Sequence, residues 1–121
     1  MLQFNRVKMS YRAQNNFAQL KFKTGLNINV LARYGLCLSL DDPSIPNPQE
    51  YDDKGMEILP SVLFGEHEPM FHALFLKRLE KDKLDPQKYL QEMVRAHLNR
   101  GAVALFPRIS DLTDFYELIK V

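Results

Sequence analysis

Residues 4–40 read FNRVKMSYRAQNNFAQLKFKTGLNINVLARYGLCLSL, and this stretch decides the order of the first elements of the fold. It opens with residues that alternate in polarity, which is the period of an extended strand. The alternation places Asn5, Val7 and Met9 on one face and Arg6, Lys8 and Ser10 on the other. The sequence therefore predicts a short N-terminal strand with one basic face.

Two helices are predicted after this strand, separated by a glycine turn. Ser10 suits the N-cap of the first helix, whose apolar residues follow at the spacing i, i+4, i+7. Gly25 can end that helix in the left-handed conformation that other residues resist. Asn27 can cap a second helix over residues 28–40, which is apolar enough to be mostly buried. Strand, helix, turn and helix is the order of a ribbon-helix-helix module.

A lone N-terminal strand needs a partner, and the sequence shows no obvious one within the chain. We therefore expect it to pair with its copy in a second subunit. A two-stranded ribbon fits the major groove of B-DNA, so Arg6, Lys8 and Ser10 would face DNA. The free N–H groups that begin the second helix, near Asn27, would suit a phosphate.

Charge is divided very unevenly along the chain. Residues 1–40 carry no Asp or Glu and a net charge of +6, whereas the remaining 81 residues carry −5 and the total is only +1. This division points to an anionic partner of the first third, although a solvated basic face without a partner remains an alternative. The complete absence of acids favours nucleic acid. The candidate DNA-binding residues are Arg6, Lys8, Arg12, Lys21, Lys23 and Arg33.

The rest of the chain predicts a loop followed by helices, so that one mainly α domain spans residues 1–121. Residues 41–55 contain three prolines and five acids, which predicts an acidic loop rather than a helix or strand. Residues 56–121 form the helical part, with about three helices. One is expected from Glu66, one from Asp85 to about Gly101, and one capped by Ser110.

No residue constellation predicts an enzyme, a metal site or a cofactor. His67 and His72 are five residues apart, whereas two ligands on one helical face need a spacing of four. His97 is expected to cap or pack near a helix end, and Cys37 to be inert packing in the second helix. No apolar run approaches the roughly 18 residues of a membrane span. MLQFNRVKMS lacks the apolar stretch of a secretory signal, so we expect a cytoplasmic protein.

Three stretches together resemble one protein family. They are the segment KFKTGLNINVLARYGLCLSLDDPSIPNP (21–48), VLFGE (62–66) and AHLNRG (96–101). In this order and at this length, they are similar to the DndE family, the small component of the bacterial DNA sulfur-modification (phosphorothioation) system. The resemblance runs from Arg6 to about Leu118.

The resemblance implies a DNA-binding, tetrameric and non-catalytic component that prefers nicked duplex through clustered surface lysines. It also implies partner proteins that carry out the sulfur chemistry, in modification, in a linked restriction step or in both. On this chain the binding role would fall to the six basic residues named above. Two other functions stay open. The chain could be an adaptor that assembles the other modification proteins without touching DNA, or a stand-alone ribbon-helix-helix regulator.

Overall fold

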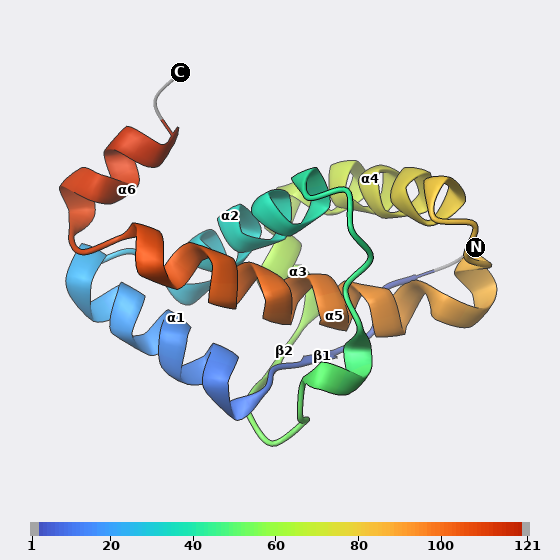
Figure 1. The fold of residues 1–121 in the computed structure, drawn as a ribbon, viewed down its shortest axis with the longest axis horizontal. Helices are drawn as coiled ribbons and strands as arrows, with labels where there is room; N and C mark the ends of the chain where they lie inside the picture. Colours follow the sequence, from blue (N-terminus) through green and yellow to red (C-terminus); the bar gives the residue numbers. More distant parts are fainter. Residues whose placement is uncertain (1–2, 120–121) are drawn as a thin grey trace.

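Helices make up most of the computed structural model, which describes residues 3–119. This confirms the mainly α prediction, with a short N-terminal strand. Figure 1 shows α5 running across the middle of the molecule, with α1 below its C-terminal half and α2 and α4 above it in that view. The elements in chain order are β1 (Val7–Lys8), α1 (Tyr11–Thr24), α2 (Ile28–Asp41), η1 (Pro48–Glu50), β2 (Glu57–Ile58), α3 (Pro60–Phe64), η2 (Gly65–His67), α4 (Glu68–Lys81), α5 (Pro86–Leu105), η3 (Phe106–Arg108) and α6 (Leu112–Ile119).

The caps of α1 are those that the sequence predicts. The Ser10 hydroxyl oxygen accepts a hydrogen bond from the Ala13 N–H at 3.0 Å. Gly25 ends the helix at φ 75°, and its N–H donates to the Lys21 carbonyl. The N-cap of the last helix, α6, differs from the prediction. The Asp111 carboxylate, and not the Ser110 side chain, accepts a hydrogen bond from the Asp114 N–H in the first turn.

Helix α5 does not stop near Gly101 as predicted but continues to Leu105. Gly101 lies inside the helix because α2 crosses α5 there with the backbones in contact. A Cβ added at Gly101 would overlap the carbonyl group of Gly35. Glycine at this position therefore serves close helix packing rather than helix termination.

The strand β1 finds its partner within the chain, so the expected pairing with a second subunit is wrong. It pairs antiparallel with β2, with Val7 opposite Ile58 and Lys8 opposite Glu57. Met9 extends this ladder by two hydrogen bonds of 2.9 Å. Its N–H donates to the Met56 carbonyl, and its carbonyl accepts from the Gly55 N–H.

The other edge of the strand segment is covered by amide side chains of α5. Gln91 accepts from the Asn5 N–H at 2.9 Å and donates to the Arg6 carbonyl at 2.8 Å. Asn99, which is fully buried, accepts from the Ser10 N–H at 2.7 Å. Because β2 and α5 together occupy both edges, β1 cannot form a ribbon with a copy of itself. Ser10 is buried and does not face solvent as predicted.

Three arginines hold the acidic proline-containing loop against the helices, which explains how a loop of this length stays ordered. Arg78 donates to the Ser44 carbonyl at 2.6 Å, and Arg100 donates to the same carbonyl at 2.9 Å. Arg95 donates to the Pro48 carbonyl at 2.7 Å. The loop forms no regular helix or sheet, so its carbonyls lack the backbone donors found there. The guanidinium groups supply these donors instead. The predicted loop over residues 41–55 is confirmed from Asp42 onward, since Asp41 is still the last residue of α2; η1 is the one helical turn of the loop among the described residues.

His97 is a core residue, as the sequence suggests, and it is held in the neutral form. Its Nδ1 lies 2.8 Å from the Ser39 hydroxyl oxygen, which also accepts from Arg100 Nε. The Ser39 hydrogen is therefore available for His97. Burial, together with the nearby positive charges of Arg78 and Arg100, lowers the pKa of His97 to about 3.

This histidine gives the fold a specific pH dependence. The unfolded chain binds a proton near pH 6.5, whereas the native chain does so only near pH 3, so native stability falls as the pH drops through this window. We expect a loss of about 1.4 kcal/mol per pH unit, or roughly 2 kcal/mol between pH 6.5 and 5. Urea unfolding at pH 7 and pH 5 measures this loss. His97→Gln should unfold at similar urea concentrations at both pH values, and an equal pH dependence in the variant would assign the loss to other groups.

Candidate nucleic-acid interface

The six predicted DNA-binding residues do not form one cluster. Arg6 directly precedes β1 and Lys8 lies on it, and both share the carboxylate of Glu57, at 3.7 Å and 3.6 Å. Both are exposed, so these ion pairs are weak and screened. The neighbouring acid on β2 nevertheless reduces the positive potential of this part of the surface.

Arg33 is directed at α3 and not at the glycine turn. Its Nη1 donates to the Leu63 carbonyl at 3.1 Å, and its side chain is half-buried. It lines an open hollow of about 280 Å³ together with Cys37, His67 and Met70. Cys37 is exposed, so the expectation of a buried packing residue is wrong. Partial burial still raises the pKa of its thiol, which makes it a poorer nucleophile than an ordinary cysteine.

The remaining three cations lie on α1, whose outer face carries no acid. The helix buries one stripe of side chains against the core and leaves the opposite side open. Within residues 3–119, no carboxylate forms an ion pair with Arg12, Lys21 or Lys23. We call the exposed residues of this helix the α1 surface; they are Tyr11, Arg12, Ala18, Gln19, Lys21, Phe22 and Lys23.

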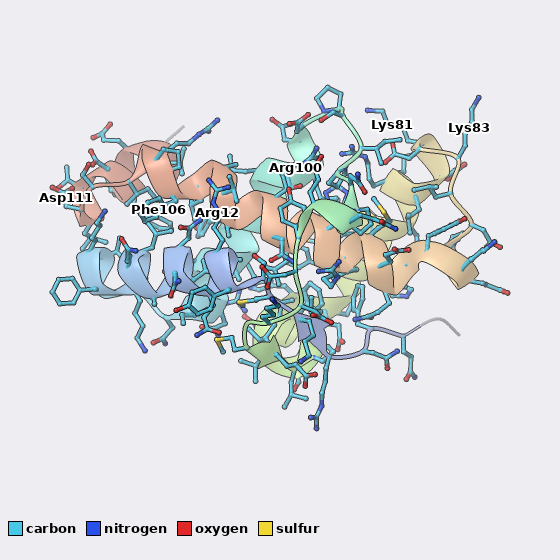
Figure 2. The ribbon with its side chains drawn as sticks, turned by 60° about the horizontal axis from the view of Figure 1, so that its bottom comes forward. Arg12, Lys81, Lys83, Arg100, Phe106 and Asp111 are labelled. Atoms are coloured by element: carbon cyan, nitrogen blue, oxygen red, sulfur yellow. The ribbon has the colours of Figure 1, made fainter. Side chains whose placement is uncertain are left out.

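The C-terminal end of α5 extends this surface. The Lys23 ammonium lies 4.9 Å from the centre of the Phe106 ring, which orients the lysine toward η3. Figure 2 shows Arg12 and Phe106 in the region where α1 runs beside the end of α5. Arg108 is exposed on the same short helix, η3, as Phe106. No sequence pattern groups Arg108 with α1, because only tertiary packing brings η3 to that helix.

The α1 surface can bind anions, and its boundaries are defined by charge. Unpaired ammonium and guanidinium groups on an exposed helix contact phosphates directly. Helix α6 packs against α1 and carries Asp114 and Glu117. Asp111 directly precedes α6, and Figure 2 shows it at one end of the molecule. Among residues 3–119, no three His, Cys, Asp or Glu side chains are placed to hold a metal ion. None of the helices in this part of the chain has the length and apolar character of a membrane span.

Comparison with known proteins gives one family. Residues 6–111 match the family model for the DNA sulphur modification protein DndE. Among solved structures, DndE from Escherichia coli B7A, described as involved in DNA phosphorothioation modification, has 24% identity and a TM-score of 0.67, with 87% of this chain and 99% of that chain covered. A double glycine-to-lysine mutant of DndE has 22% identity and a TM-score of 0.66, with the same coverage. These two likenesses show a common fold. A comparison with curated protein sequences finds no significant match.

Proposed function

Since the chain belongs to the DndE family, which takes part in DNA phosphorothioation, we propose that it is a non-catalytic subunit that binds duplex DNA through the α1 surface. The observation that carries this proposal is the presence of Arg12, Lys21 and Lys23 on an exposed helix without any acid. Arg6, Lys8 and Arg33 take secondary roles, because Arg6 and Lys8 share the Glu57 carboxylate and the Arg33 guanidinium donates to the Leu63 carbonyl. The sulfur chemistry belongs to partner proteins, and the cytoplasm is the expected location.

A preference for nicked duplex follows from the mechanics of DNA. A nick is a flexible point, so bending a nicked duplex along a basic surface costs less than bending an intact one. Equal bending of both substrates by the bound protein, measured by energy transfer between dyes at the two ends, would count against this explanation.

Protein contacts are the second part of the proposal. Val62, Met70 and Leu74 are 48%, 50% and 42% exposed on α3 and α4. Exposed apolar side chains on neighbouring helices suit a second subunit or another modification protein. These exposed side chains suit a homo-oligomer, and they suit the adaptor alternative equally well. A ribbon-helix-helix regulator is not proposed, because both edges of β1 are hydrogen-bonded within the chain.

We expect Lys21→Gln/Lys23→Gln to weaken binding to intact and nicked duplex on the order of 10-fold at physiological salt, because two phosphate contacts are lost. The slope of log affinity against log salt should become shallower by about 2. Titrations at several salt concentrations measure both quantities.

The matched control is Lys81→Gln/Lys83→Gln, which removes the same charge from the far end of the molecule seen in Figure 2. It should leave the slope unchanged. An equal loss in both double variants would indicate non-specific attraction, and wild-type protein that binds partner proteins but neither duplex would favour the adaptor.

A further inference from the structure

Phe22 has no packing role in the fold. It lies in the last turn of α1, and 90% of its surface is exposed, more than that of any other large apolar side chain among the described residues. Its neighbours three and four residues away on the helix face are Ala18, Gln19, Gly25 and Leu26, of which Ala18 and Gly25 carry only a methyl group and a hydrogen. With 90% of its surface exposed, the phenyl ring is open to a partner.

The charges around the ring indicate which partner it suits. Phe22 stands between Lys21 and Lys23, both of which are exposed, on a helix without acids. Consecutive residues of a helix point about 100° apart, so the two lysines diverge on either side of the ring. An aromatic ring between two cations is complementary to a base between two backbone phosphates, because the ring can stack on the base while the cations contact the phosphates. Base–aromatic stacking tolerates every base, since each has a π-face.

We propose that Phe22 stacks on a base exposed at a break in duplex DNA while Lys21 and Lys23 contact the phosphates that flank the break. This inference rests on the DNA-binding function proposed above and assigns a residue to the recognition of the nick. In intact duplex both faces of each base pair are already covered by neighbouring pairs, and opening a step is costly. At a nick the backbone no longer resists opening, so one base face becomes accessible to the ring.

The test compares two hairpin-closed duplexes of identical sequence, one intact and one with a single nick. Closing both ends with the same loops removes the base faces that ordinary duplex ends would offer. We expect Phe22→Ala to weaken binding to the nicked duplex about 10-fold, from the loss of one stacked base. Binding to the intact duplex should change by less than about 2-fold. Phe22→Tyr, which keeps the π-face, should retain the wild-type preference for the nick.

Folding of the variants is not expected to differ, because the ring is exposed; thermal unfolding of each variant verifies this. The stacking role is overturned if Phe22→Ala keeps the preference for the nick. It is also overturned if the affinities for nicked and intact duplex fall by the same factor. Wild-type binding without any preference for the nick overturns it as well and leaves DNA binding intact, whereas failure of the wild type to bind either duplex overturns both proposals. A change in native mass on Phe22→Ala would show that a second copy of the chain covers the ring.

Discussion

Gly101→Ala is expected to lower the free energy of unfolding by about 3 kcal/mol, the upper part of the range for overpacked cores. The added Cβ would overlap the carbonyl group of Gly35 on the crossing helix α2. Backbone cannot move aside as a flexible side chain can, so α2 and α5 would have to separate along their interface. The gain in helix propensity from alanine, about 1 kcal/mol, offsets only part of this cost. Urea unfolding measures the difference.

The reciprocal variant is the matched control. A Cβ at Gly35 would lie 3.1 Å from the Gly101 carbonyl carbon, which is tight but not overlapping. Gly35→Ala should therefore cost clearly less than Gly101→Ala, although both add one methyl group to the same crossing. Equal stabilities of the two variants would contradict the asymmetric contact between α2 and α5.

Arg78→Met is expected to cost about 3–5 kcal/mol, the range for removing one partner of a buried ion pair. The side chains of Arg78 and Asp82 are 6% and 5% exposed, and Nε of Arg78 lies 2.8 Å from the Asp82 carboxylate. The guanidinium also donates to the carbonyls of Leu40 and Ser44. Methionine fills similar space but leaves the Asp82 charge unpaired and removes the side-chain donor of the Leu40 carbonyl, while the Ser44 carbonyl keeps only its bond from Arg100.

A second substitution separates the charge from the hydrogen bonds. In Arg78→Met/Asp82→Asn the buried carboxylate is no longer charged, so part of the lost stability should return. Denaturation midpoints of the wild type, both single variants and the double variant give the coupling energy. If the double variant is no more stable than Arg78→Met, the main role of Arg78 is to hold the carbonyls of the loop.

Local signals in the sequence predict the caps and the turn, because those contacts form between neighbouring residues. The Ser10 cap and the left-handed Gly25 are of this kind. The two-residue strand β2 has too few residues for any periodicity, so the partner of β1 could not be found. Gly101 gave a misleading signal, since glycine marks both helix ends and close helix crossings.

The candidate site was predictable in composition but not in arrangement. Counting charges singled out the acid-free first third of the chain, which contains α1. The contact of Arg33 with α3, and of Lys23 with Phe106, depends on how the helices pack. Exposure of Phe22 is equally a tertiary property, since a phenylalanine in a helix is more often buried.

The amide contacts of α5 also fix the order in which this chain can fold. Gln91 and Asn99 satisfy backbone groups that precede them by 85 to 91 residues. A ribosome must therefore synthesise most of the chain before its first strand acquires a complete set of partners. Contacts of such sequence separation close large loops late, which slows folding relative to helical proteins with only local contacts. The N-terminal segment is consequently among the first parts made and among the last to be fixed in place.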